Sequence, residues 1–241
     1  QIPELPFCNI WTAMQLSSRL PKGALFHMGV SNTRRCWNMF QLPESVESAC
    51  NVGCCGIDGC VSTLVGASLV NPDRLCYVVV GDLTFFYDLN SLGNHHIGTN
   101  LRVMLVNNGR GTEFRLGIHH CNVFGDDADK YMAAAGHFGN KSPLLVKHYA
   151  EDLGFHYLSA TTKEEFMTAL SNFTNPQLSD HSMILEVFTD SKDESEALYL
   201  MSHIQSDAKG MVRSKLKDAV RNVAGEKGIC LLYTSDAADE R

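Results

Sequence analysis

Two polar pairs in the middle of the chain carry residue types that can hold a divalent cation. Gly81 and Asp82 close one apolar run, and Asn107 and Asn108 close the next one. Asp82 and Asn108 offer hard oxygen atoms, which Mg²⁺ prefers, and this ion usually completes its shell with phosphate oxygens and water. Together with the backbone carbonyl of Arg110, these side chains could bind one Mg²⁺ and, through it, one diphosphate.

The flanking segments explain how these residues could meet. Residues 75–80 and 101–106 are short apolar runs, typical of parallel strands buried on both faces, and residues 83–93 are predicted as the connecting helix. The carboxyl ends of such strands lie side by side, so Asp82 and Asn108 can converge although 26 positions separate them. An ordinary turn, with Asp82 capping the next helix and the Asn pair forming a loop, is the alternative that spacing leaves open.

Three segments, in the same order, resemble one family. The Gly-Asp and Asn-Asn pairs resemble the diphosphate-binding motif of thiamine diphosphate-dependent enzymes, although the third motif position, often Gly, is Leu83. The run Gly-Asp-Leu-Thr-Phe-Phe-Tyr-Asp-Leu-Asn at 81–90 looks like the form found in the 2-succinyl-5-enolpyruvyl-6-hydroxy-3-cyclohexene-1-carboxylate synthases of menaquinone biosynthesis. Residues 50–59 are similar to the loop of these synthases that ends in Gly-Ile-Asp-Gly, and residues 25–35 resemble their Gly-x-Ser-x-x-x-Arg segment.

The resemblance implies two cofactors, thiamine diphosphate and Mg²⁺. Asp82, Asn108 and the Arg110 carbonyl would bind the metal, and Thr84 would contact the diphosphate. Ile57 matches the bulky apolar residue that wedges the cofactor into its bent shape. The cofactor-binding residues implied in this way are Ser31, Gly56, Ile57, Asp58, Gly81, Asp82, Leu83, Thr84, Asn108 and Arg110.

Two positions bear on the substrates that the resemblance implies, a 2-oxo acid and an acceptor. Arg35 matches a position that serves the cofactor or a substrate carboxylate, for which a guanidinium is a natural partner. Val52 stands where the synthases have a substrate-binding Arg, which argues against isochorismate as the acceptor. A synthase that decarboxylates a 2-oxo acid and adds the acyl group to an acceptor is the first hypothesis. An acetolactate-synthase-like carboligase, a 2-oxo acid decarboxylase and a non-catalytic binding module remain alternatives.

Composition narrows the class of protein. The 241 residues carry a net charge of −7 with no basic run, which argues against a nucleic-acid surface. We expect no membrane span, and the nine cysteines, without a signal-like start, suggest thiols in a reducing cytoplasm. The resemblance further implies a homodimer or homotetramer. It also places the Glu that activates the cofactor in a separate N-terminal domain, so no catalytic residue is assigned here and we expect no turnover from this chain alone.

Alternating strand and helix patterns predict an α/β fold, a doubly wound parallel sheet with helices on both faces. We expect residues 1–21 to be the tail of an upstream domain, 22–207 the cofactor-binding domain and 208–229 a terminal helix. Residues 230–241 resemble a translated sequencing adapter and are expected to be non-native. The strands are predicted at 24–29, 75–80, 101–106, 155–158 and 182–188, and the helices at 7–20, 32–42, 56–70, 83–93, 126–136, 143–153, 163–173 and 191–205.

Overall fold

The computed structural model describes residues 2–53, 56–116, 119–132, 137, 139, 141–202 and 204. The chain divides into two compact units. The larger is Glu4–Leu198, and the smaller combines Gln1–Pro3 with Tyr199–Arg241. The fold below is that of the larger unit. The terminal helix predicted at 208–229 and the tail at 230–241 lie outside the described residues.

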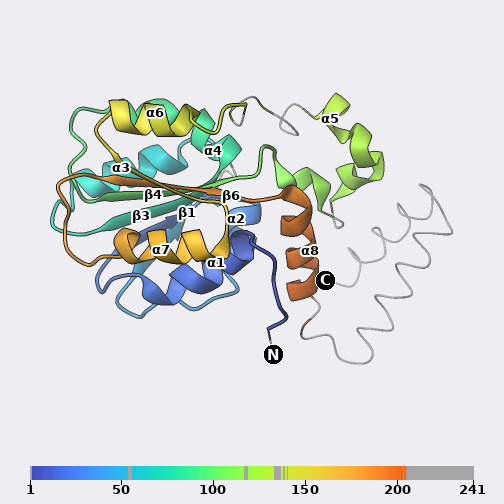
Figure 1. The fold of residues 1–241 in the computed structure, drawn as a ribbon, viewed down its shortest axis with the longest axis horizontal. Helices are drawn as coiled ribbons and strands as arrows, with labels where there is room; N and C mark the ends of the chain where they lie inside the picture. The colour runs from blue at the N-terminus through green and yellow to red at the C-terminus, as the bar shows by residue number, and fades with distance from the viewer. Residues whose placement is uncertain are drawn as a thin grey trace. The chain divides into compact units, whose positions relative to one another are not determined.

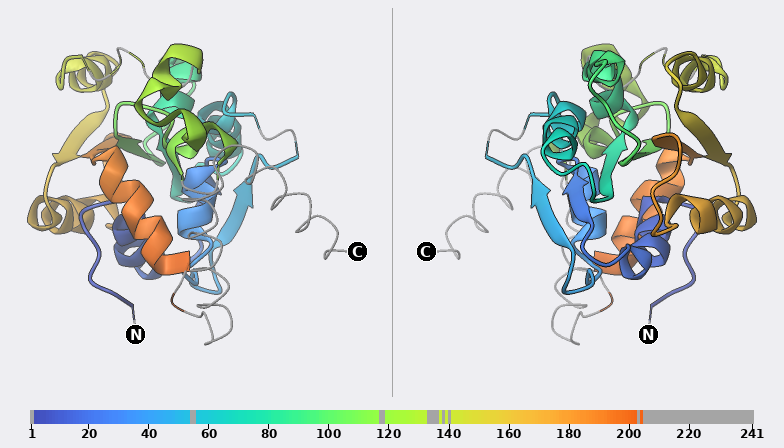
Figure 2. Two further views of the ribbon diagram at one scale, coloured as in Figure 1. Left: turned by 90° about the vertical axis from the view of Figure 1, so that its right-hand side faces the viewer. Right: turned by 90° about the vertical axis from the view of Figure 1, so that its left-hand side faces the viewer.

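The described strands form one six-stranded sheet in which every pair is parallel. The order is β2-β1-β3-β4-β6-β5, with β2 and β5 at the two edges (Figures 1 and 2). This arrangement confirms the predicted doubly wound sheet. The strands are β1 (Leu25–Met28), β2 (Glu47–Cys50), β3 (Cys76–Gly81), β4 (Leu101–Asn107), β5 (His156–Ala160) and β6 (Met183–Phe188).

Helices cover both faces of the sheet (Figure 1). No helix in the described part of the chain is both long and apolar enough to cross a bilayer. The α-helices are α1 (Asn9–Leu16), α2 (Asn32–Trp37), α3 (Cys60–Leu69), α4 (Asp82–Tyr87), α5 (Ala128–Tyr131), α6 (Leu145–Asp152), α7 (Lys163–Phe173) and α8 (Ser191–Ser202). The 3₁₀-helices are η1 (Ser17–Arg19), η2 (Leu89–Gly93), η3 (Thr112–Arg115) and η4 (His120–Asp127).

Strand β3 shows how the two cores are built. Alternate residues of a strand point to opposite faces, and a parallel strand is usually buried on both. Val78 and Val80 belong to the core under α3, α4 and α6. Tyr77 points to the other face, where its ring packs 5.5 Å from that of Phe173 in α7. The continuous apolar run therefore packs against a layer of helices on each face of the sheet.

The order in which strands are added to the sheet changes direction between β1 and β3. From β1 it crosses through α2 to β2, whereas from β3 it crosses through α4 to β4 on the opposite side. Right-handed crossovers then place α2 and α4 on opposite faces, which opens a crevice beyond the carboxyl ends of β1 and β3. Gly29 allows the close approach there, because a Cβ would lie 3.2 Å from the carbonyl oxygen of Val79. In open α/β sheets, ligands bind at such a switch point.

Several elements differ from the sequence predictions; helix α2, for example, ends at Trp37 instead of residue 42. Strand β2 was not predicted, because its residues are mostly exposed at the sheet edge and carry no apolar pattern. Helix α3 begins at Cys60 instead of residue 56, since Gly59 precedes it in a left-handed conformation with φ of 81°. The compact unit begins at Glu4, and α1 buries Ile10 and Leu16 completely. The domain boundary expected at residue 21 stays a prediction.

Candidate functional site

A cavity of about 130 Å³ lies at the switch point. This volume is the space open to the centre of a water-sized sphere, of which one water needs roughly 10–15 Å³. The cavity therefore suits a group of about ten heavy atoms, such as a diphosphate. Its walls come from α1, from the segments that follow β1, β3 and β4, and from the loop before α3. The lining residues are Asn9, Val30, Ser31, Asn32, Thr33, Ile57, Gly81, Asp82, Leu83, Thr84, Val106, Asn108, Arg110, Gly111, Thr112, Glu113 and Phe114.

Most of the residues predicted for the site lie in this cavity. Ser31, Ile57, Asn108 and Arg110 line it together with residues 81–84. The expected convergence of the two strand ends is thus present. Gly56, Asp58 and Arg35 are not part of the lining, and their roles at the site stay predictions.

Those three residues lie next to the cavity. Asp58 is exposed, and a Cβ at Gly56 would collide with its carboxylate, so this glycine serves the turn before α3. The Arg35 guanidinium forms an ion pair with Glu113, a lining residue that the sequence did not single out. Arg35 therefore contacts the wall of the cavity from outside.

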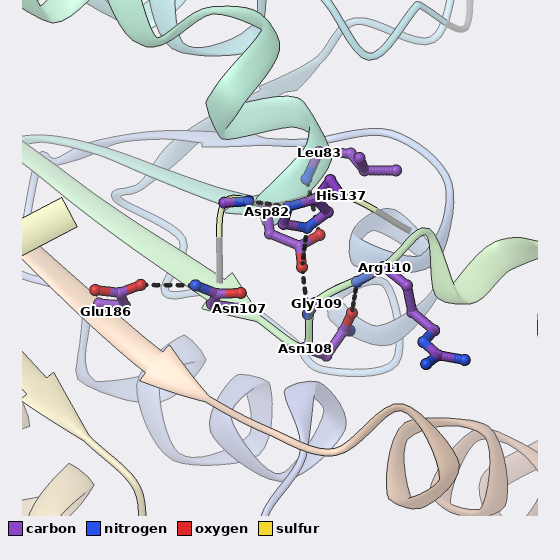
Figure 3. A network of polar contacts seen from close by, with 9 residues as sticks. Asp82, Leu83, Asn107, Asn108, Gly109, Arg110, His137 and Glu186 are labelled. Atoms are coloured by element: carbon purple, nitrogen blue, oxygen red, sulfur yellow. Dashed lines mark hydrogen bonds and ion pairs between the residues drawn. The ribbon is translucent and has the colours of Figure 1, made fainter. Parts of the chain in front are cut away.

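Asp82 is the central acid of the cavity and is only 2% exposed. Its Oδ1 accepts a hydrogen bond from the backbone N–H of Leu83 (2.8 Å), and its Oδ2 accepts one from Gly109 N–H (2.6 Å; Figure 3). The amide oxygen of Asn108 accepts a bond from Arg110 N–H at 3.3 Å. The Gly109 bond joins the first residue of α4 to the segment that follows β4.

His137 approaches the same carboxylate and was not predicted. Its Nε2 lies 3.0 Å from Asp82 Oδ2, an attractive distance although the two groups lack hydrogen-bond alignment (Figure 3). Its Nδ1 accepts a bond from Gly139 N–H at 2.9 Å. A nitrogen that accepts carries no proton, so Nδ1 is the unprotonated nitrogen of this ring. No motif spacing in the sequence links His137 to residue 82.

The oxygen ligands predicted for the metal suit Mg²⁺ better than a transition metal. Within the described residues, no three His, Cys, Asp or Glu side chains are grouped as metal ligands. The predicted set instead combines the Asp82 carboxylate, the Asn108 amide and a backbone carbonyl, all hard oxygen donors. Thr112 supports a ligand in this space, because this residue lines the cavity and its buried hydroxyl oxygen has no hydrogen-bond partner. A buried polar atom without a partner is costly, so a bound group is the natural partner here.

Ser31 holds a strained backbone at the cavity wall. It is the non-glycine residue with positive φ in the described part of the chain, at φ 59° and ψ −125°. A side chain there clashes with the backbone, and such strain collects at functional sites. The strain follows from the turn that leads from β1 into α2 beside the ligand space.

Replacing Ser31 by glycine should raise the free energy of unfolding by about 1 kcal/mol, because glycine adopts positive φ without the steric cost. Ser171→Gly is the matched control. Ser171 lies exposed in α7, where glycine should lower stability by about 0.5 kcal/mol. Urea unfolding of both variants checks the opposite signs. A destabilised Ser31→Gly protein would mean that the hydroxyl matters more to the fold than the strained turn.

A buried carboxylate supports the Asn pair from behind. Glu186 in β6 is 1% exposed and accepts hydrogen bonds from Asn107 Nδ2 and from the Tyr157 hydroxyl, both at 2.7 Å (Figure 3 shows the Asn107 bond). Burial raises the pKa of Glu186, and the two donated bonds act in the opposite direction. This network fastens Asn107, and with it the backbone of Asn108, to the neighbouring strand.

Tyr157→Phe should cost about 2 kcal/mol of unfolding free energy, the range for a hydrogen bond to a charged group. Tyr149→Phe is the matched control, because the Tyr149 hydroxyl donates to a neutral acceptor, the Leu89 carbonyl (2.8 Å), and should cost about 1 kcal/mol. Urea unfolding at pH 8 measures both. Equal costs would show that Glu186 is protonated in the folded protein.

Comparison with known proteins agrees with the motifs. No protein-family profile matches the chain. A 2-succinyl-5-enolpyruvyl-6-hydroxy-3-cyclohexene-1-carboxylate synthase from Bacteroides fragilis is 34% identical over 196 residues, which cover 81% of this chain and 34% of that protein. The synthase of the same name from Phocaeicola vulgatus is 34% identical over 200 residues, 82% of this chain and 34% of its own. That of Christiangramia forsetii is 33% identical over 195 residues, 81% of this chain and 32% of its own.

These relatives confirm the resemblance identified in the sequence. The chain spans about a third of the length of the curated relatives that it matches. Through that region, the chain is homologous to the 2-succinyl-5-enolpyruvyl-6-hydroxy-3-cyclohexene-1-carboxylate synthases.

Proposed function

We propose that this chain is the diphosphate-binding part of a thiamine diphosphate- and Mg²⁺-dependent synthase. The whole enzyme would decarboxylate a 2-oxo acid and add the acyl group to an acceptor. One observation carries the proposal: Ser31, Ile57, Asp82, Thr84 and Asn108, which belong to three separate motifs, line one cavity at the switch point of the sheet. Homology to the synthases supports the same assignment.

Each residue would have a distinct task. Asp82, Asn108 and the Arg110 carbonyl would hold Mg²⁺, and Thr84, which is 6% exposed, would donate to the diphosphate. Ile57 would shape the cofactor from the loop before α3. Bound thiamine diphosphate supplies the carbon centre that stabilises the charge left by decarboxylation, while the protein binds, orients and excludes water. The proposal includes a homodimer or homotetramer in the cytoplasm, supported by the resemblance alone.

Isothermal titration of the full chain tests the binding part of this proposal. Thiamine diphosphate and inorganic diphosphate should both bind in the presence of Mg²⁺, and neither should bind measurably in EDTA. Orthophosphate should bind at least tenfold more weakly than diphosphate, because it cannot bridge the metal and the α4 side of the cavity. If diphosphate does not bind at millimolar concentration with Mg²⁺ present, the proposed function is wrong.

A further inference from the structure

Asn9, the first residue of α1, brings an uncharged amide to the cavity wall. Its segment is separate in the chain from the segments after β3 and β4, which carry Asp82 and Asn108. Mg²⁺ has an octahedral shell that it shares with protein ligands. A diphosphate held by the metal therefore keeps oxygen atoms free for donors on other walls of the cavity.

The orientation of the Asn9 amide is fixed by its neighbour. The indole Nε1–H of Trp37, a residue that is 2% exposed, donates to Asn9 Oδ1 at 3.0 Å. An indole N–H can only donate, so the amide atom that it meets must be the oxygen. The amide nitrogen, with its two N–H donors, is therefore the branch of the side chain that does not contact Trp37.

This nitrogen opens onto the cavity. In the described part of the chain, Asn9 Nδ2 donates to no protein atom, and unlike the Thr112 hydroxyl it is not enclosed by protein. Asn9 is only 3% exposed and lines the cavity, so the cavity is the open space that its nitrogen meets. Two N–H donors thus face the ligand space without a protein acceptor.

The backbone of Asn9 is held in place as well. Both carboxylate oxygens of Glu194 accept from the Asn9 N–H, at 3.0 and 3.1 Å, and the Asn9 carbonyl accepts from the Thr12 hydroxyl at 2.8 Å. Glu194 and Thr12 are both fully buried. A donor that is already fixed loses little freedom when it binds, and a bond to a charged oxygen is roughly twice as strong as a neutral one.

We propose that Asn9 is a diphosphate-binding residue, whose side-chain amide donates to a diphosphate oxygen that the metal does not hold. This inference rests on the proposed function and adds a neutral donor to the same site. It also gives the Trp37 indole a task, since its bond leaves the amide nitrogen free for the ligand. An uncharged donor suits this wall because it binds the anion without repelling the nearby cation.

Calorimetric titration of the full chain with inorganic diphosphate and Mg²⁺ tests the proposal. Asn9→Asp keeps an oxygen that can accept from Trp37 and replaces the donor by a negative charge, whereas Asn9→Ala removes both groups. We expect the affinity for diphosphate to fall at least tenfold in Asn9→Ala, and further in Asn9→Asp. Thiamine diphosphate should lose the same factor, because the bond is made to the group that both ligands share.

NMR of the wild type gives a second measurement that does not depend on how the variants fold. The side-chain NH₂ signals of Asn9 are identified by their absence from the spectrum of Asn9→Asp. They should shift clearly more when diphosphate is added with Mg²⁺ than with Mg²⁺ alone. Signals that stay in place when diphosphate binds would show that Asn9 supports the fold without touching the ligand.

Asn71→Ala is the matched control for the titration. The Asn71 side-chain amide donates to the Ala67 carbonyl at 2.9 Å, and Asn71 does not line the cavity. Its diphosphate affinity should stay within twofold of the wild type. Equal affinity in the wild type and in Asn9→Ala would overturn the role of Asn9 and leave the proposed function intact, as would a loss confined to thiamine diphosphate. If the wild type does not bind diphosphate, the proposed function is wrong, and this inference with it.

Discussion

Replacing Asp82 by asparagine is expected to weaken Mg²⁺-dependent diphosphate binding on the order of 100-fold, because the cation loses its charged ligand in a poorly solvated cavity. The amide has nearly the same shape, so the fold should survive. Its Oδ1 can still accept the bond from Gly109 N–H or that from Leu83 N–H, but not both. Titration of inorganic diphosphate with and without Mg²⁺ measures the effect.

Asp88→Asn is the matched control for that experiment. Asp88 is also buried, at 8% exposure, and its Oδ2 accepts a bond from Ser62 N–H (2.7 Å) at the start of α3, but it does not line the cavity. An asparagine retains the accepting oxygen. We expect diphosphate affinity within twofold of the wild type. Unchanged affinity in Asp82→Asn would remove Asp82 from the metal ligands and the metal assignment with it.

A second large effect should come from pH acting through Glu194. This residue is fully buried and accepts bonds from Asn9 N–H (3.0 and 3.1 Å to its two oxygens) and from the Thr189 hydroxyl (2.6 Å). Burial raises its pKa from 4.5 to about 7; the bonds from Thr189 and Asn9 lower it, whereas the charges of Asp82 and Asp193 add to the increase. The folded protein therefore keeps a proton here that the unfolded chain releases.

The sign of the pH dependence follows from this difference in proton binding. Below pH 4.5 both states hold the proton, and the stabilisation is fully present. Between pH 4.5 and 7 the folded state binds more protons, so stability falls as pH rises, by about 3 kcal/mol in total from this group. Buried His27 opposes the trend, because its pKa is lowered by burial and its contribution to stability increases with pH.

Comparison with Glu194→Gln isolates the effect of the carboxyl group. The glutamine does not titrate, so the difference in unfolding free energy between wild type and variant should change by about 3 kcal/mol between pH 4.5 and pH 8. Urea unfolding at half-unit intervals gives this curve, and His27 cancels because both proteins contain it. A constant difference across the range would show that folding does not raise the pKa of Glu194.

The parts of the fold that were predictable have strong local signals. Strands β3 and β4 are apolar on both faces. This pattern is typical of a central strand in a sheet whose two faces are both covered by helices. Helix α7 occupies the predicted residues because Thr162 caps it, accepting from Glu165 N–H at 3.2 Å, and Glu165 accepts in return from Thr161 N–H at 2.7 Å. By contrast, β2 has an exposed edge position and only its pairing with β1 makes it a strand.

The site was predictable to the extent that its residues follow strands. Asp82 and Asn108 end neighbouring strands, so the topology brings them together. Asn9, Thr112 and Glu113 were missed because they reach the cavity through tertiary packing that no spacing in the sequence encodes. Arg35 was predicted to serve the cofactor or a substrate, and no pattern in the sequence indicates that an acid 78 positions away pairs with it.

The cavity at the switch point also links distant parts of the chain. Four separate segments meet at the cavity, through Asn9, Ser31, Asp82 and Asn108. A molecule that contacts all four residues holds these segments together and so stabilises the folded state. A ligand that binds only the folded state adds about 2.7 kcal/mol at a concentration 100 times its dissociation constant. The melting temperature of the chain can therefore rank candidate ligands directly, without any measurement of turnover.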